Sequence, residues 1–133
     1  MSDFNYEVEM PVRFRDLDPM GHVNNAAYAT YLEQARIEYV ENVVEKPLLE
    51  TGAVVASLEL NFEHPIEYDD TVTVAVGVNE LGTSSIPVTY EIRANGEVAA
   101  TAETTMVLYD HEAGEPHPIP DDWRDPIKAH EGL

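Results

Sequence analysis

The chain alternates apolar residues with polar or small ones over five separate segments, and this period of two constrains its fold more than any other feature. Successive side chains of a strand point to opposite faces, so the alternation predicts strands that bury one face. The predicted strands cover about residues 6–14, 54–62, 72–78, 86–94 and 98–108. The first is defined by Tyr6, Val8, Met10, Val12 and Phe14. Long, one-sided strands of this kind predict a broad antiparallel sheet with one covered face.

One helical pattern interrupts the strands. Apolar residues recur at intervals of three and four between about residues 22 and 44, and Pro47 follows as a stop signal. The pattern predicts a helix of about 22 residues, roughly 33 Å long. Because no other segment can cover the sheet, the sequence predicts an α+β fold in the order strand, long helix, then four strands, with the sheet wrapped around the helix. We interpret the proline-rich residues 111–133 as an irregular tail of a single domain over residues 1–133.

The outer strands and the uncovered side of such a sheet are costly to leave bare in a single chain. Pairing two sheets edge to edge in a homodimer removes part of that cost. The sequence therefore predicts a homo-oligomer, either a dimer or a tetramer.

The charge of the chain excludes several classes of partner. Its 26 acidic residues against seven basic ones give a formal net charge of −19. Such a surface repels nucleic acid and anionic membranes, so we expect neither as a partner. No apolar segment approaches the roughly 20 residues of a membrane span. The acidic N-terminus lacks the basic and apolar blocks of a signal peptide, and we expect a cytoplasmic protein.

The chain is also poor in lysine and free of cysteine. Without cysteine there is no disulfide, thiolate metal site or cysteine nucleophile. An acid-rich, lysine-poor composition resembles that of proteins from organisms with molar salt in the cytosol, where the Debye length shrinks to about 3 Å. The composition predicts a halophilic protein, and an ordinary acidic protein is the alternative.

The stretch from Asp16 to Asn25, "DLDPMGHVNN", places two carboxylates, a turn and a histidine directly before the helical pattern. Asp18 followed by Pro19 fits the start of a helix. Alternatively, Asn24 or Asn25 caps the helix and Asp18 lies in the loop before it. In the second case a carboxylate stands beside free N–H groups that polarise a carbonyl and stabilise an oxyanion. These are the minimum parts for hydrolysing an ester or a thioester.

The longer stretch "DLDPMGHVNNAAYATYLEQAR" resembles the signature of hotdog-fold thioesterases of the 4-hydroxybenzoyl-CoA thioesterase type. That signature has Asp-X-Asp, then Gly, a short polar stretch, Tyr, and a helix with Glu-X-Ala-Arg. The segments "LGTSSIPVTYEI" and "PHPIPDDWRD" are similar to later parts of the same family. The resemblance implies the hotdog fold and hydrolysis of an acyl-CoA thioester without a cofactor or a metal. An acyl-carrier-protein thioesterase and a non-catalytic acyl-thioester-binding protein are the alternatives.

The resemblance also implies roles for residues around the helix start. It assigns the catalytic carboxylate, as nucleophile or as general base toward water, to Asp18, and leaves Asp16 a structural role. The backbone N–H that polarises the thioester carbonyl maps to Asn25. Gly21 allows the backbone to approach a ligand closely. His22 stands where related plant enzymes have a catalytic histidine, but Met20 replaces their asparagine, so His22 is either a positioning residue or a proton carrier.

Other candidate contacts lie further along the chain. Glu33 is a candidate for orienting the site, and its spacing from Arg36 is compatible with an ion pair. Ser84 and Ser85 are candidates for contacting the acyl group or the pantetheine arm, or they belong to an ordinary turn. No motif ranks the basic residues as phosphate contacts; the candidates are Arg15, Lys46, Arg93 and Arg124.

Overall fold

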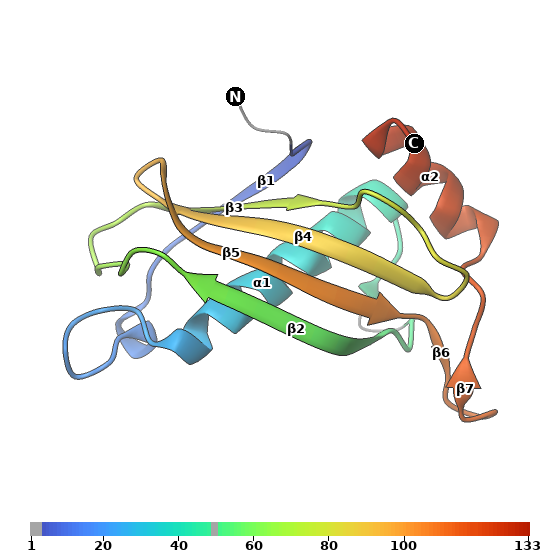
Figure 1. Ribbon diagram of the computed structural model, residues 1–133, viewed down its shortest axis with the longest axis horizontal. Coiled ribbons are helices and arrows are strands. Elements are labelled where there is room, and N and C mark those ends of the chain that lie inside the picture. Colours follow the sequence, from blue (N-terminus) through green and yellow to red (C-terminus); the bar gives the residue numbers. More distant parts are fainter. Residues whose placement is uncertain (1–3, 49–50) are drawn as a thin grey trace.

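The computed structural model describes residues 4–48 and 51–133, and it shows a five-stranded antiparallel sheet curved around one long helix (Figure 1). The strands lie in the order β1-β3-β4-β5-β2. Their bounds are Tyr6–Met10 for β1, Val54–Phe62 for β2, Val72–Gly77 for β3, Ser85–Ala94 for β4 and Glu97–Val107 for β5. The predicted α+β architecture is confirmed, with the predicted order of strands and helix along the chain.

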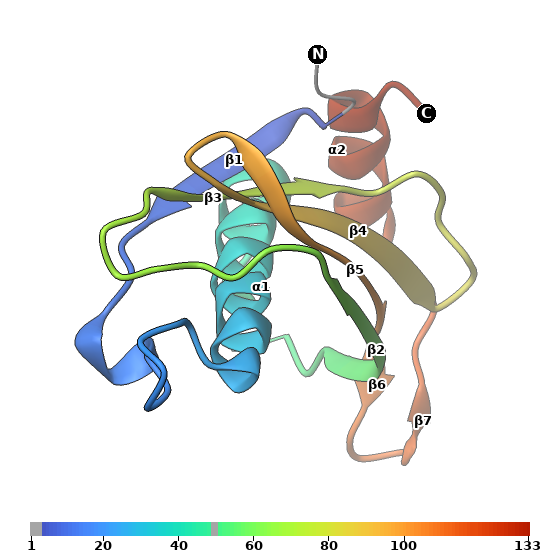
Figure 2. The same cartoon turned by 60° about the vertical axis from the view of Figure 1, so that its left-hand side comes forward.

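The long helix α1, Asn25–Tyr39, crosses the concave face of the sheet and continues into a π-helical turn at Val40–Val44 (Figure 2). Asn24 caps its start with its side chain, so the helix begins after Asp18 and Pro19 rather than at them. Inward-facing residues of the sheet pack against α1 because the alternation in β4 buries every second side chain. These buried β4 residues are Ile86, Val88, Tyr90, Ile92 and Ala94.

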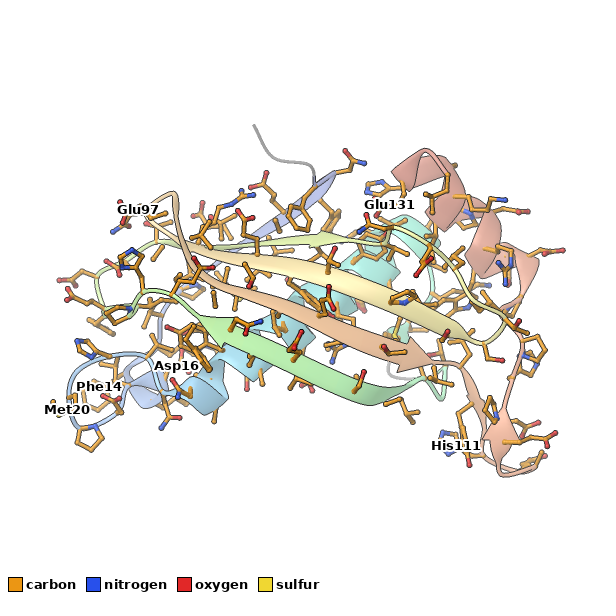
Figure 3. The ribbon with its side chains drawn as sticks, in the orientation of Figure 1. Phe14, Asp16, Met20, Glu97, His111 and Glu131 are labelled. Atoms are coloured by element: carbon orange, nitrogen blue, oxygen red, sulfur yellow. The ribbon has the colours of Figure 1, made fainter. Side chains whose placement is uncertain are left out.

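The predicted first strand is too long at its C-terminal end. β1 ends at Met10, and residues Phe14–Asp16 form a short 3-10 turn in which Phe14 is 80% exposed. Pro11 has no N–H to donate to the neighbouring strand and stops the ladder. The alternation beyond that point therefore has no partner strand, and Phe14 lies at the same end of the molecule as Asp16 (Figure 3).

The prediction of an irregular tail is wrong. Two short strands, β6 (Tyr109–Asp110) and β7 (Glu115–Pro116), form a hairpin, and a second helix, α2, spans Asp121–Glu131. Acidic residues in its first turn and basic ones in its last match the helix dipole. Trp123 and Ile127, one turn apart, are buried. Their burial offsets the backbone hydrogen bond that Pro126 removes inside the helix.

The two edges of the sheet differ in how far their side chains are buried. At the β1 edge, Arg93 joins Glu7 across the strands at 2.8 Å, and Val8 and Met10 are buried. At the β2 edge, nearly every residue is exposed, and the side chains on the α1 side of the sheet are apolar. Three of them, Val55, Leu58 and Phe62, pair with the inward-facing β5 residues Met106, Thr104 and Ala100 and are 44%, 49% and 47% exposed. We call these three residues the β2 apolar row.

The predicted ion pair between Glu33 and Arg36 is not formed. Arg36 turns under the sheet, is only 8% exposed, and donates from Nη1 to the hydroxyl of Tyr90 at 3.1 Å. The Tyr90 hydroxyl in turn lies 2.7 Å from Oγ1 of Thr104. The spacing of three residues allows the pair, but the guanidinium group donates to the buried hydroxyl of Tyr90 in β4 instead.

Candidate active site

Asp18 lies in a tight turn directly before α1. Its Oδ1 accepts hydrogen bonds from the backbone N–H of Met20 at 2.8 Å and of His22 at 3.2 Å. The turn closes when Gly21 N donates to the Asp18 carbonyl at 3.0 Å, and Gly21 has φ +83°, a conformation that favours glycine. Both bonds to the carboxylate use the same oxygen. Within the described residues, Oδ2 of Asp18 has no hydrogen-bond partner.

The first turn of α1 leaves one N–H group free. The side chain of Asn24 accepts from Ala26 N at 2.9 Å, and its carbonyl accepts from Ala27 N at 2.9 Å. No group in the part of the chain that the structure describes accepts from the N–H of Asn25. A free N–H at a helix start carries partial positive charge and favours a negative oxygen.

Asp18 and Asn25 line the same pocket, of about 280 Å³. The rest of its wall comes from His22, Val23, Tyr28, Phe62, Glu63, His64 and Pro65. We call it the Asp18 pocket. The ring of Phe62 meets that of Tyr28 edge-on, with centroids 4.9 Å apart, so the β2 apolar row ends in this pocket. The pocket thus joins a carboxylate and a free N–H to an apolar surface.

Sequence analysis missed the part of this wall that comes from residues 62–65. Phe62 ends β2, and Glu63, His64 and Pro65 follow it, far along the chain from Asp18. The course of β2 beside α1 brings them to the site (Figure 2). Tyr28 secures this junction by donating from its hydroxyl to the carbonyl of His64 at 3.4 Å. Burial raises the pKa of Tyr28, so this hydroxyl stays protonated as a donor. The one local signal was the His-Pro pair at the strand end.

Asp16 has the structural role that was predicted for it. Its Oδ2 accepts from the hydroxyl of Tyr31 at 2.9 Å and from the backbone N–H of Arg13 at 2.8 Å. Its carbonyl also accepts from Asn24 N at 2.7 Å, which ties the loop to the helix cap. Burial, and then the hydrogen bond to Asp16, raise the pKa of Tyr31. Asp16 therefore fixes the loop that carries Asp18.

Of the other predicted site residues, some line the Asp18 pocket and some lie away from it. His22 lines the Asp18 pocket, whereas Gly21 and Glu33 do not, and Glu33 is exposed two turns further along α1. Ser84 and Ser85 lie at the start of β4, roughly 20 Å along the strand from the residues level with the pocket. A single chain does not bring the two serines to Asp18.

The arrangement has the parts that acyl transfer to water requires. An ionised carboxylate with a free oxygen either attacks a carbonyl carbon or takes a proton from water. A free N–H such as that of Asn25 can donate a hydrogen bond to the negative charge that develops on a carbonyl oxygen. Among the described residues, no group of three or more His, Asp or Glu side chains is arranged to hold a metal ion. Neither α1 nor any other described helix combines the length and apolar character that a membrane crossing needs.

The chain belongs to the thioesterase-like superfamily, which matches its residues 12–127. This match covers the Asp18 turn, α1 and strands β2 to β5. It confirms the hotdog fold and identifies the protein as a thioesterase.

Particular relatives sharpen this assignment. The long-chain acyl-CoA thioesterase FadM of Escherichia coli is 28% identical over 109 residues, which cover 78% of this chain and 83% of FadM. A chloroplastic acyl-acyl carrier protein thioesterase of Arabidopsis thaliana, ATL3, is 33% identical over 95 residues, 68% of this chain and 48% of ATL3. A solved thioesterase from Thermus thermophilus, complexed with coenzyme A and Zn, has a TM-score of 0.91 and 41% identity, and covers 100% of this chain and 98% of its own.

Proposed function

We propose that this protein hydrolyses acyl-CoA thioesters to the free acid and CoA, with Asp18 as the reacting carboxylate. The observation that carries the proposal is the pocket that Asp18 and Asn25 both line, in which Asp18 Oδ2 and the Asn25 N–H have no hydrogen-bond partner among the described residues. The similarity to FadM and to a CoA-bound thioesterase supports CoA as the carrier of the acyl group.

The chemistry follows from the position of the two groups. As a general base, Asp18 takes a proton from water, and the water oxygen adds to the thioester carbon. The carbonyl oxygen becomes an oxyanion and accepts the Asn25 hydrogen bond, which is stronger to an anion than to a neutral carbonyl. The C–S bond then breaks, and the thiolate is protonated as the acid is released. As a nucleophile, Asp18 attacks the thioester carbon, the C–S bond breaks, and CoA leaves as the thiolate, which is then protonated. Water cleaves the resulting anhydride in a second step, which releases the acid and restores the Asp18 carboxylate.

We propose that a second copy of the chain completes the acyl pocket. The β2 apolar row lies on an open sheet edge and runs into the Asp18 pocket. Edge strands with exposed apolar side chains invite pairing with another chain. Pairing of two β2 edges would cover the row and bring residues of the partner toward the reaction centre.

We also propose that the acidic surface is matched to a cytosol with molar salt. The net charge of −19 destabilises the compact state by self-repulsion at low ionic strength, and salt screens that repulsion. Thermal unfolding measured at rising KCl concentration tests this. We expect the melting temperature to rise from dilute buffer to molar KCl, and a flat or falling curve would exclude a halophilic protein.

The function is tested with a panel of acyl-CoA esters of different chain length and of aromatic type, assayed in molar KCl beside matching acyl-carrier-protein thioesters. We expect hydrolysis of at least one acyl-CoA ester with a higher kcat/KM than that of the same acyl group on the carrier protein. The similarity to ATL3 favours the carrier protein as the second candidate, and the opposite preference would establish it. A folded protein that binds these esters without hydrolysing any of them would be a binding protein instead.

A further inference from the structure

A second pocket lies on the other side of the start of α1. It measures about 520 Å³ and is lined by residues of the β1–α1 loop and of the first three turns of α1. Arg13 and Arg15 both line it. We call it the arginine pocket, and we propose that it binds the phosphate groups of the CoA nucleotide. This inference rests on the proposed function and adds the site that recognises the carrier.

The other basic side chains are already used elsewhere, with the exception of Lys128. Arg36 is buried against Tyr90, and Arg93 is paired with Glu7 and Glu91. Lys46 pairs with Asp122 at 2.8 Å, and Arg124 donates to the carbonyl of Gly82 at 2.8 Å. Three of the four candidates from the sequence, Lys46, Arg93 and Arg124, thus have partners within the chain.

The guanidinium groups of Arg13 and Arg15 have no ion-pair partner among the described residues, although the chain has a large excess of carboxylates. Within residues 4–48 and 51–133, neither guanidinium group makes an ion pair or a hydrogen bond. Two free guanidinium groups that face one pocket offer the fork-shaped donors that phosphate oxygens accept. Lys128 lies in a different pocket that also contains Glu80.

The local charge of the arginine pocket is positive although the protein is strongly negative. Its ionisable side chains besides Tyr31 are Arg13, Arg15 and Asp16. The Asp16 carboxylate is held at the pocket wall by the Tyr31 hydroxyl and the Arg13 N–H. The two arginines outweigh this one carboxylate. In high salt, where the field of the whole protein is screened, this local balance decides whether an anion binds.

The place of the arginine pocket suits a molecule that reaches into the Asp18 pocket. Asn24 and Ala26 line the arginine pocket, while Asn25 and Tyr28 line the Asp18 pocket. The two pockets therefore flank the same first turn of α1. In acyl-CoA a long, flexible pantetheine arm separates the thioester from the phosphates. An acyl-CoA with its thioester beside Asp18 can pass over this turn and place its phosphates against Arg13 and Arg15.

The test compares an acyl-CoA that the protein hydrolyses with the matching acyl-pantetheine, which lacks the nucleotide and its phosphates. The variants are Arg13→Gln, Arg15→Gln and the double variant. We expect each single change to raise KM for acyl-CoA about tenfold, and the double change about a hundredfold, with kcat within about twofold. The kcat/KM for acyl-pantetheine stays unchanged, because that substrate makes no contact with the arginines.

Lys128→Gln is the matched control, since it removes one unpaired positive charge at the other end of the sheet. We expect it to leave both substrates unaffected. The proposal is overturned if the double variant keeps the wild-type KM for acyl-CoA, or if Lys128→Gln causes the loss instead. It is also overturned if the double variant lowers kcat/KM for acyl-pantetheine as much as it lowers kcat/KM for acyl-CoA.

Calorimetric titration with CoA and with pantetheine separates this inference from the proposed function, because it requires no hydrolysis. We expect the wild-type protein to bind CoA at least about tenfold more tightly than pantetheine, and the double variant to bind both equally. A wild-type protein without that preference for CoA contradicts the arginine pocket even when the enzyme is active. If the wild-type protein prefers CoA, the double variant loses that preference, and no acyl-CoA is hydrolysed, the arginine pocket is supported and the proposed hydrolysis is refuted.

Discussion

The two sides of the α1 start use similar residues for opposite purposes. On the arginine side, Asp16 binds the Tyr31 hydroxyl and the Arg13 N–H, so its carboxylate is occupied within the fold. On the other side, Asp18 lines a pocket and uses one oxygen to hold its own turn, while its second oxygen has no hydrogen-bond partner among the described residues. Two aspartates separated by one residue thus have different roles. The first positions the loop, and the second is available for chemistry.

The largest expected effect is that of Asp18→Asn. The amide retains a side-chain oxygen that can accept the bonds from Met20 N and His22 N, so the turn is preserved. It cannot act as a base or as an anionic nucleophile, and we expect kcat to fall by about 10³-fold or more. The measurement is kcat by thiol release, with the melting temperature as the check on folding.

Asp16→Asn is the control for this prediction, because it makes the same chemical change two residues earlier. The amide oxygen can still accept from Tyr31 and Arg13, so we expect kcat to stay within about fivefold of the wild-type value. Equal losses in the two variants would mean that the contrast between the two aspartates is false.

The second-largest effect is expected at the open β2 edge of the sheet. This edge carries Phe62, which lines the Asp18 pocket but not the arginine pocket. Leu58→Glu places a charge in the β2 apolar row, where Leu58 is 49% exposed in the single chain. We expect it to weaken self-association by at least about 2 kcal/mol and to reduce hydrolysis with it. The measurement is molar mass by light scattering over a range of concentrations, beside the activity.

Ser57→Glu is the matched variant, since Ser57 precedes Leu58 on β2 and points to the opposite face. We expect it to leave the oligomer intact. A wild-type protein that is active as a monomer would show that the Asp18 pocket needs no partner.

The smallest effect is expected for a change of Asn24, which caps α1 between the arginine pocket and the Asp18 pocket. Asn24→Ala removes the acceptor for Ala26 N, and we expect the free energy of unfolding to fall by about 1 kcal/mol in a urea titration. Since it frees a second N–H near Asn25 without moving Asp18, we expect kcat to change by less than about tenfold. A loss as large as that of Asp18→Asn would mean that the cap itself takes part in the reaction.

The sequence is most informative where the signal is periodic and local. The alternation located all five strands, and the change to helical spacing located α1 to within a few residues. Errors occur where another local constraint opposes the period. Pro11 ends β1 before Phe14, and the prolines of residues 111–133 concealed a helix held by the burial of Trp123 and Ile127.

The site was predictable on one side only. Asp18, His22 and Asn25 stand in one continuous stretch, so a local motif found them. Phe62 and His64 reach the pocket through the pairing of distant strands, which no local pattern encodes. The same limit explains Arg36, because helical spacing places it near Glu33 but does not reveal that Tyr90 lies beneath it.

The central claim is that the thioester carbonyl lies between Asp18 and the start of α1. A crystal structure of the Asp18→Asn protein with an intact acyl-CoA tests it most directly, because that variant is expected to bind the substrate without cleaving it. The account predicts a carbonyl oxygen about 2.7–3.1 Å from the Asn25 nitrogen, with the thioester carbon beside the residue 18 side chain. A thioester bound elsewhere, with the Asn25 N–H still open to solvent, would contradict it.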